Sequence, residues 1–319
     1  ARAAGGAPGA AALRAAACLG LQRYAESLSE LLGPQGGEGE ASGGSLEADV
    51  RACAPTLEAQ SLGRFDFAEI YWRRSWPALL PPLADFVGPV EVAELPATGV
   101  RGLRALEDIE RGRLLMVSTS LVRTEPLSGR AAASVSALSR FQASASAAAK
   151  AYRRAAEISP HARRLLGSAL SDGSPRGAVP VAQLSWSGAP RGAGEVPPLA
   201  PGAAMDGVCN TNAFARSGQE AIFPAVSMMN HSCLPNAVTI MVGESLLVRA
   251  CRRIPAGAEV SISYFDTLQP RAKRAEVTQL NWKFTCGCRR CEVELAARLG
   301  PLEAAGAGDG GAGAIRALE

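Results

Sequence analysis

Histidine, lysine and long apolar runs are scarce in this 319-residue chain. It has two histidines and three lysines, so nearly all of its 33 basic residues are arginines. These are balanced by 30 acidic residues, so net charge gives no indication of direct nucleic-acid binding. No stretch approaches the roughly 20 apolar residues of a membrane span, and no signal-peptide pattern occurs. We therefore expect an intracellular protein, in the nucleus or cytoplasm, with no membrane partner.

Cysteine is better represented, with eight residues. In an intracellular setting cysteines are usually thiols or metal ligands rather than disulfides. Cys286, Cys288 and Cys291 form a C-x-C-x2-C pattern within "CGCRRC". So tight a loop directs three sulfurs toward one point, and Zn²⁺ takes four ligands tetrahedrally. The spacing predicts a structural zinc site that needs one more ligand.

Spacing does not choose the fourth ligand. The candidates are Cys209, Cys233, Cys251, His161 and His231. His161 lies in a polar segment that we predict to be exposed, and Cys251, like Cys18 and Cys53, is most simply a buried small side chain. The best donor is then "NHSCLPN" (230–236), through either His231 or Cys233. A Cys/His nucleophile pair in this motif is the competing hypothesis, but it lacks an orienting third group and a nucleophile signature.

The first half of the chain is predicted to be largely helical. Apolar periodicity predicts helices at 11–32 and 45–62, joined by a Gly-rich linker at 33–44. The aromatic-rich segment 63–76 is predicted to be a docking helix. Short strands are predicted at 90–93 and 114–118, with a glycine turn at 111–113.

The middle of the chain is poor in structural signals. Residues 131–171 are Ala/Ser/Arg-rich and helix-prone, 186–204 predict a Pro/Gly loop, and 304–319 predict a disordered tail.

The segment 205–294 carries most of the information. Alternation predicts strands at 238–242 and 246–248, joined by a hairpin at Gly243-Glu244. After a turn at 255–257, Val260, Ile262 and Tyr264 share one predicted strand face, and Glu259, Ser261 and Ser263 share the other. Residues 271–280 predict a short helix.

Five segments, in this order, resemble SET-domain protein lysine methyltransferases. The most similar type is the SET-and-MYND group and its plant and algal relatives with tetratricopeptide repeats. The segments are "GVRGLRALEDIERGRLL" (99–115), "TNAF" (211–214), "MMNHSCLPN" (228–236), "VRACRRIPAGAEVSISYFD" (248–266) and "FTCGCRRC" (284–291).

The resemblance implies an α+β fold. It has a mainly β, pseudoknotted SET core with a helical insert, a C-terminal zinc-binding post-SET loop and an N-terminal α-helical, tetratricopeptide-like segment. The implied divisions are 1–62 (tetratricopeptide-like), 63–87 (docking helix and linker), 88–124 (SET, N-terminal part), 125–204 (helical, low-complexity insert), 205–268 (SET catalytic core), 269–295 (post-SET zinc region) and 296–319 (disordered tail).

The resemblance also implies roles for particular residues. Cys233 joins Cys286, Cys288 and Cys291 as the ligands of a structural zinc. Tyr264 is the catalytic residue of an S-adenosylmethionine-dependent protein lysine N-methyltransferase. The implied cofactor-binding residues are Arg101, Gly102, Leu103, Asn212, Asn230, His231, Tyr264 and Phe284, with Phe284 against the adenine. Phe214 and Trp282 are implied to line the channel for the substrate lysine of a histone or another protein.

Three departures from the family pattern support a rival hypothesis. The family's Gly-Arg-Gly reads Val100-Arg101-Gly102, and a channel aromatic that is often tyrosine is Trp282. The MYND finger is absent, since 125–204 contain no cysteine. The rival is a catalytically weak SET module that binds protein partners through its N-terminal helices. A zinc-stabilised protein without cofactor is a further alternative, and it is opposed by Asn212, Asn230, His231 and Tyr264.

Overall fold

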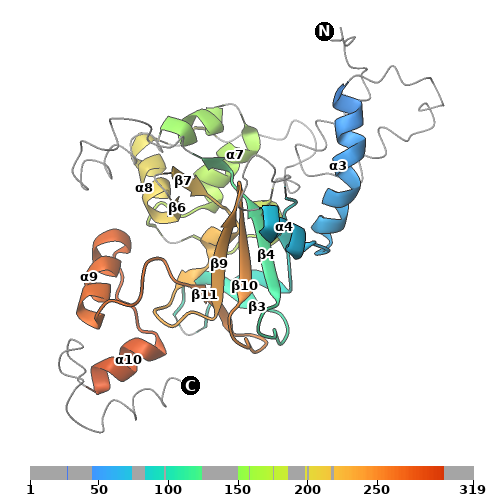
Figure 1. Cartoon of the computed structure of the whole chain (residues 1–319). Helices are drawn as coiled ribbons and strands as arrows, with labels where there is room; N and C mark the ends of the chain where they lie inside the picture. The colour runs from blue at the N-terminus through green and yellow to red at the C-terminus, as the bar shows by residue number, and fades with distance from the viewer. Residues whose placement is uncertain are drawn as a thin grey trace, which may run out of the picture.

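The computed structural model describes residues 27, 45–73, 83–96, 98–123, 150–157, 159–174, 176–185, 198–199, 201–216 and 219–297 (Figure 1). The predicted helix 11–32, apart from Ser27, the linker 33–44 and the predicted tail 304–319 lie outside these residues. None of the described helices is both long and apolar enough to cross a membrane.

The described strands form three sheets. The first has the order β1 (Phe86–Val87), β4 (Leu114–Thr119), β10 (Ser245–Ala250) and β9 (Ala237–Val242). The second has the order β2 (Val90–Glu94), β3 (Arg101–Ala105), β11 (Glu259–Ile262) and β8 (Asn230–His231). The third has the order β5 (Val122–Arg123), β7 (Gln219–Ile222) and β6 (Ala213–Arg216). Neighbours are antiparallel except β8 and β11, which pair in parallel.

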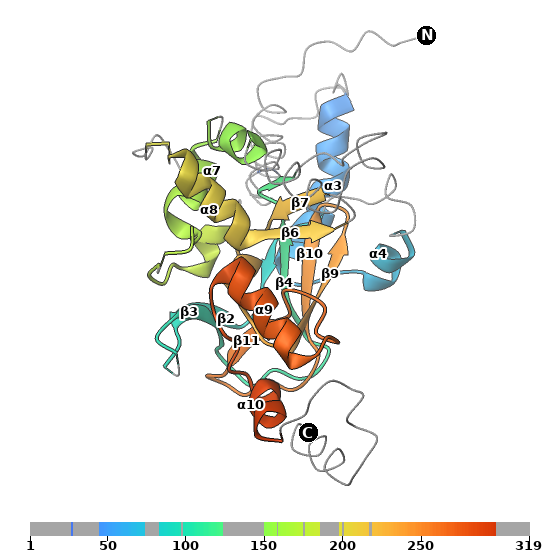
Figure 2. The same ribbon diagram turned by 90° about the vertical axis from the view of Figure 1, so that its left-hand side faces the viewer.

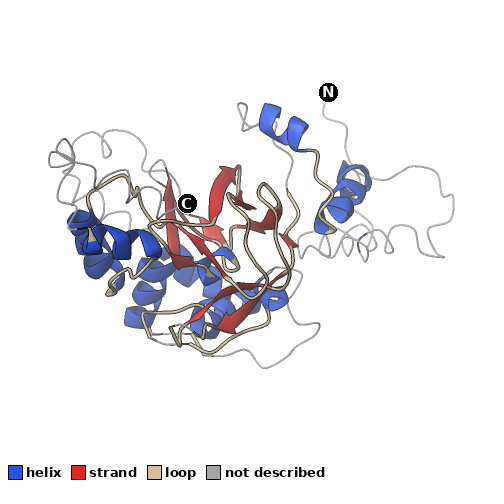
Figure 3. Ribbon diagram, turned by 90° about the horizontal axis from the view of Figure 1, so that it is seen from below, coloured by secondary structure: helices blue, strands red, loops and turns tan. Residues whose placement is uncertain are grey.

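Helices surround these sheets, and Figure 3 shows the strands lying between them. They are α3 (Ser45–Ser61), α4 (Phe67–Arg73), residues 150–157, α7 (Pro160–Arg164) with η2 (Leu165–Ala169), η3 (Val181–Leu184), α8 (Gly202–Asn212), η5 (Val226–Met228), α9 (Arg271–Trp282) and α10 (Arg289–Ala296). Figure 1 shows α9 and α10 on one side of the sheets and α3 on the other, and Figure 2 shows α9 in front of the strands. The fold is therefore a mixture of helix and strand.

The β9–β10 hairpin is confirmed. Gly243 has φ 58°, a left-handed conformation that glycine adopts at no steric cost, and it reverses the chain so that Ser245 pairs with Val242. β10 is buried along most of its length because Leu246, Val248 and Ala250 on one face lie in the main core, and Leu247 on the other face lies in the cluster that contains Ile70 of α4. The predicted strands at 90–93 and 114–118 are also confirmed, as β2 and β4.

The predicted helix at 45–62 is confirmed as α3, and α4 lies within the predicted docking helix, of which residues 74–76 are outside the described residues. An Asp66 carboxylate oxygen accepts the Glu69 backbone N–H at 3.0 Å, which caps the start of α4. Ile70 packs with Leu83 and Val117 against the first sheet. Because only Ser27 and α3 are described within residues 1–62, the tetratricopeptide-like interpretation is not confirmed.

Two elements of the structure, α8 and β1, lie at boundaries of the predicted divisions. The loop predicted at 186–204 ends early, since α8 begins at Gly202, so the division at 204/205 cuts a helix. The linker 63–87 contains β1, which pairs with β4 and belongs to the first sheet.

Two predictions about side-chain exposure are also wrong. His161 is only 6% exposed, because α7 packs against the segment that contains Ser185, whose carbonyl lies 2.9 Å from His161 Nε2. Cys251 is exposed at the end of β10, where its thiol contacts the Pro235 carbonyl oxygen at 3.5 Å.

Candidate metal and cofactor site

Four cysteine sulfurs lie together near the C-terminal end of the described chain. The Sγ atoms of Cys233, Cys286, Cys288 and Cys291, here called the cysteine cluster, all lie within 4.8 Å of one another. Zn–S bonds of about 2.3 Å in a tetrahedron place sulfurs about 3.8 Å apart. The four residues therefore fit a tetrahedral thiolate site, such as a structural zinc site.

Distant segments supply these sulfurs. Cys233 follows β8, Cys286 and Cys288 lie in the loop between α9 and α10, and Cys291 lies in the first turn of α10. The remaining ligand candidates, Cys209, Cys251, His161 and His231, do not belong to the cluster. A bound metal would join the "NHSC" segment to the two C-terminal helices.

Five rings gather beside the cysteine cluster. His231 lies at the centre of this aromatic cluster, with ring centroids 5.4 Å from Tyr264, 4.7 Å from Phe265 and 6.0 Å from Phe284. Trp282 completes it, 5.1 Å from Tyr264 and 6.3 Å from Phe265. The structure thus brings together four aromatic residues of the predicted site, His231, Tyr264, Trp282 and Phe284.

The end of α9 positions two of these rings. Lys283 has φ 60°, and this left-handed residue ends the helix. Trp282 is the last helical residue, and Phe284 follows in the loop that leads to the cysteines. Phe265 was missed by the sequence analysis, although it stands next to the predicted catalytic residue in "SYFD".

Tyr264 does not continue the strand face that was predicted for it. β11 ends at Ile262, and Ser261 on the opposite predicted face is also buried, so both faces of the strand are covered. In the bend that follows, the Tyr264 hydroxyl donates to the Met229 carbonyl at 2.7 Å. Burial, followed by the nearby Glu259 charge, raises the pKa of Tyr264, so its phenol stays protonated at neutral pH.

His231 connects Tyr264 to the cysteine cluster. Its Nδ1 accepts the Tyr264 backbone N–H at 3.1 Å, so the proton of a neutral ring lies on Nε2. Nε2 is 3.3 Å from Cys233 Sγ and can donate to that sulfur. His231 therefore contacts a predicted zinc ligand as well as the predicted catalytic tyrosine.

Asn230 is held in one orientation by three residues. Its Nδ2 donates to the Arg101 carbonyl at 3.1 Å and to Glu259 Oε1 at 2.9 Å. A Cβ on Gly102 would lie 2.7 Å from this nitrogen, so glycine is required for the approach. Among the described residues Asn230 Oδ1 has no hydrogen-bond donor, which leaves it able to accept from a bound group.

Glu259, on the predicted strand face opposite Val260, is half-buried beside Asn230. Burial raises its pKa, while the hydrogen bond from Asn230 acts in the opposite direction. Its backbone carbonyl accepts from Asn236 Nδ2 at 2.7 Å, and Asn236 Oδ1 accepts from the Ser261 N–H at 2.8 Å. The final residue of "NHSCLPN" therefore fastens this motif to β11, a role that the sequence analysis did not assign.

Arg101 and Asn212 both contact the segment 169–177. Arg101 Nη1 donates to the Ala169 and Gly177 carbonyls at 2.8 and 3.1 Å. Asn212 Nδ2 donates to the Ser171 and Val208 carbonyls at 2.6 and 2.8 Å, so its donors are used and its side-chain oxygen is left as an acceptor.

The remaining predicted site residues face the protein interior. Leu103 is fully buried, so only its backbone could contact a ligand. Phe214 packs edge-on against Phe223 at 5.7 Å and adjoins the main core.

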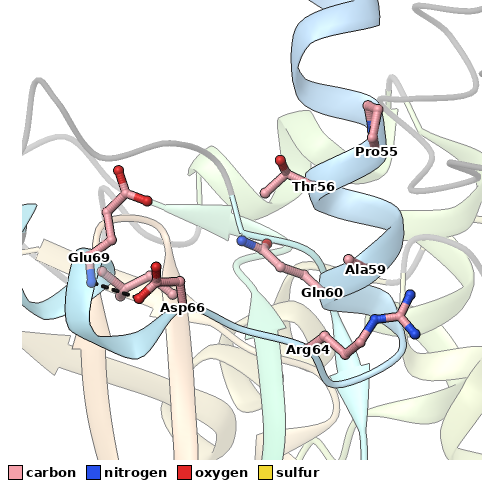
Figure 4. Close-up of a pocket in the computed structure, with 8 residues that line it drawn as sticks. Pro55, Thr56, Ala59, Gln60, Arg64, Asp66 and Glu69 are labelled. Carbon is pink, nitrogen blue, oxygen red and sulfur yellow. Dashed lines mark hydrogen bonds between the residues drawn. The ribbon is translucent and has the colours of Figure 1, made fainter.

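A separate cavity of about 360 Å³ lies between α3 and α4 (Figure 4). Figure 4 shows the Gln60 amide directed into the space between the two helices. The lining residues are Pro55, Thr56, Ala59, Gln60, Arg64, Asp66, Glu69 and Ile70. None of them belongs to the cysteine cluster or the aromatic cluster.

Comparison with known proteins identifies the family. Residues 100–265, more than half of the chain, match the SET domain, and the chain belongs to the SET domain family. Over 91 residues it is 40% identical to N-lysine methyltransferase SMYD2-A of Xenopus laevis and to N-lysine methyltransferase SMYD2 of Gallus gallus. It is 35% identical over the same length to histone-lysine N-methyltransferase SMYD3 of Mus musculus.

These matches are partial in length. Each spans 27% of this chain and 21% of the relative, about a fifth of those proteins. Among solved structures, the SET domain of LSMT bound to lysine and AdoHcy matches with a TM-score of 0.32 and 15% identity, over 74% of this chain and 59% of that one.

Proposed function

We propose that this chain carries the SET domain and post-SET zinc region of an S-adenosylmethionine-dependent protein lysine N-methyltransferase. The observation that supports this most strongly is the convergence of Asn230, His231 and Tyr264 beside the cysteine cluster, within a matched SET domain. The relatives' names, N-lysine and histone-lysine methyltransferase, agree in reaction class. The substrate class is therefore a protein lysine, in a histone or in another protein.

The acceptor groups suit the amino-acid end of the proposed cofactor. S-adenosylmethionine supplies an electrophilic methyl group on a sulfonium and carries an α-ammonium with N–H donors. The side-chain oxygens of Asn212 and Asn230 are left as acceptors because their N–H donors are already used. Backbone groups of Arg101, Gly102 and Leu103 and the Phe284 ring complete the proposed binding set.

Tyr264 is the proposed catalytic residue. Methyl transfer is an in-line displacement, so the protein contributes mainly positioning and exclusion of water. The attacking lysine amine must be neutral, and a channel with few polar groups lowers its pKa by desolvation. The Tyr264 hydroxyl, protonated and held by the Met229 carbonyl, would orient the reacting groups, with Trp282 and Phe214 proposed as channel walls.

Zinc has a structural role in this proposal. The cysteine cluster would hold it with no open position for substrate, which is typical of structural sites. By joining Cys233 to the loop after α9, the metal would hold Phe284 and Trp282 against His231 and Tyr264. Metal binding and folding of the site are then coupled.

Methyl transfer into protein tests the proposal directly. Folded, zinc-loaded protein is incubated with a proteome extract and labelled S-adenosylmethionine, beside a Tyr264→Phe variant. We expect incorporation into protein lysines that falls at least about tenfold in the variant, as for loss of a positioned catalytic group. Incorporation unchanged by Tyr264→Phe would contradict the assigned role. No incorporation by either protein, with intact S-adenosylmethionine binding, would support the scaffold alternative.

We further propose that the N-terminal helices bind a protein partner. Leu62 and Trp72 are each 63% exposed, and the cavity of Figure 4 lies in the same region. Where exposed apolar side chains form a contiguous patch, they are typical of interaction surfaces. Chemical crosslinking of the wild-type protein in a cell extract, compared with a Trp72→Ala variant of unchanged stability, tests this surface, and identical crosslinked products would contradict it.

A further inference from the structure

Arg274 is a fully buried arginine at the start of α9. Its side chain is 1% exposed, and it is among the largest fully buried side chains of the described residues. Arginine is almost never fully buried unless it is paired, since removing its charge from water is costly. The groups that surround Arg274 therefore indicate the role of its charge.

Two kinds of group face Arg274. Nη2 donates to a Glu294 carboxylate oxygen in α10 and lies 3.9 Å from Cys291 Sγ. Nη1 donates to the Gln269 carbonyl, whereas Nε is buried with no hydrogen-bond partner among the described residues. The guanidinium thus lies between a carboxylate and one sulfur of the cysteine cluster.

Arg290 approaches the same cluster from another side. Its Nε donates to the second Glu294 carboxylate oxygen at 2.7 Å. Its Nη1 donates to the Thr267 carbonyl at 2.8 Å and lies 3.4 Å from the Cys233 carbonyl. Unlike Arg274, it meets backbone oxygens around the cluster and no sulfur.

The net negative charge of a zinc-loaded cysteine cluster explains why Arg274 is buried beside it. Four thiolates around one Zn²⁺ leave two negative charges uncompensated. Glu294 is shared by two arginines, so these three residues together carry one net positive charge beside the cluster. This cation reduces the electrostatic cost of gathering four thiolates in a partly buried place.

We propose that Arg274 is a positioning residue of the zinc site: its permanent charge stabilises the thiolate set, and its contacts fix α9 to α10. This rests on zinc occupying the cysteine cluster, as proposed above. Arg274 lies in the first turn of α9, and Trp282 is the last residue of the same helix. By fixing α9 beside the metal site, Arg274 therefore also helps to hold Trp282 in the aromatic cluster.

Metal affinity tests this role without any activity measurement. Zinc-loaded wild-type protein, Arg274→Gln, Arg274→Lys and Glu294→Gln are titrated with a chromophoric chelator. Outer-shell partners of metal ligands change affinity roughly tenfold to hundredfold. We expect a loss of that size in Arg274→Gln, at least partial recovery in Arg274→Lys, and zinc affinity within about threefold of wild type in Glu294→Gln. The last variant removes the ion pair but keeps the cation beside Cys291.

Replacing zinc with Co²⁺ gives a second measurement, the energy of the charge-transfer bands. This energy would not change if Arg274 had only a structural role. Sulfur-to-Co²⁺ charge-transfer bands report the electron density of the thiolates. We expect these bands to shift to lower energy in Arg274→Gln and to stay in place in Glu294→Gln. The variants are folded in the presence of metal, so that a variant whose metal-free form is unstable can still be measured. Where Arg274→Gln does not fold, Arg274→Lys carries the test, with zinc affinity within about tenfold of wild type expected.

Three outcomes would overturn the inference. The first is wild-type zinc affinity and cobalt bands in Arg274→Gln. The second is an equal loss of zinc in Glu294→Gln and Arg274→Gln, which would make the ion pair alone responsible. The third is a wild-type protein that binds no zinc. This result would refute the zinc assignment itself, and the variants distinguish it from an error about Arg274 alone.

Discussion

The substitution Gly102→Ala tests how closely Asn230 must approach the backbone. A Cβ at position 102 would lie 2.5 Å from Leu95 Cδ1 and 2.7 Å from Asn230 Nδ2. Both contacts are shorter than atoms tolerate, and Leu95 is itself buried, so the Asn230 amide must shift. Its hydrogen bonds to Arg101 and Glu259 would then lengthen or break.

The expected magnitude has two parts. Overpacking a well-packed position costs about 1–3 kcal/mol, and a lost hydrogen bond costs about 1 kcal/mol more. We therefore expect the free energy of unfolding to fall by about 2–4 kcal/mol. Since Asn230 would no longer present its oxygen correctly, we also expect S-adenosylmethionine affinity to fall at least about tenfold, which corresponds to about 1.4 kcal/mol.

Urea unfolding and titration calorimetry measure the two effects. The matched control is Gly167→Ala, since a Cβ at position 167 meets nothing within 4 Å. Alanine there should leave stability unchanged or raise it by up to about 1 kcal/mol, with cofactor affinity intact. A Gly102→Ala protein with wild-type stability and affinity would refute the packing of Asn230 against this glycine.

The remaining predictions concern the two histidines and the cysteine cluster. Cys233→Ala should lose zinc and melt at a lower temperature, whereas His231→Ala should keep most of its zinc but lose S-adenosylmethionine affinity. Because His231 Nε2 lies 3.3 Å from Cys233 Sγ, we expect His231→Ala to weaken zinc binding about tenfold, as for other partners of metal ligands, but to keep all four cysteine ligands; metal analysis that finds equal zinc in the two variants contradicts this division. Burial, with a smaller contribution from Arg164, lowers the pKa of His161 below 6.5, although its contact with Ser185 opposes the shift. The unfolded chain then binds the proton more readily, so stability should fall as pH drops below about 6.5 and level off below the folded-state pKa. His161→Gln should flatten this part of the pH profile; an unchanged slope in denaturation between pH 7.5 and 5 would show that His161 is not responsible.

Local patterns predicted the local elements well. The β9–β10 hairpin follows from alternation and one glycine, and α9 covers the short helix predicted at 271–280. For the cysteine cluster, local spacing identified only three of the four sulfurs, because only these three lie within six residues of one another. Spacing alone left the fourth ligand open, and the family resemblance supplied Cys233, 53 residues before Cys286.

Two of the wrong predictions depend on contacts between distant segments. β11 pairs with β3 on one side and β8 on the other, so alternation could not reveal that Glu259 faces Asn230. His161 is buried by the segment around Ser185, which is 24 residues away in the chain. α8 was missed because its glycines and a preceding Pro/Gly-rich stretch resemble a loop.

S-adenosylmethionine binding tests the central proposal most directly. Titration calorimetry on zinc-loaded, folded wild-type protein should show one binding site, with affinity lost in the Gly102→Ala variant and retained in Gly167→Ala. A folded protein that carries zinc but shows no binding heat, and no melting-temperature shift with S-adenosylmethionine, would contradict the methyltransferase proposal.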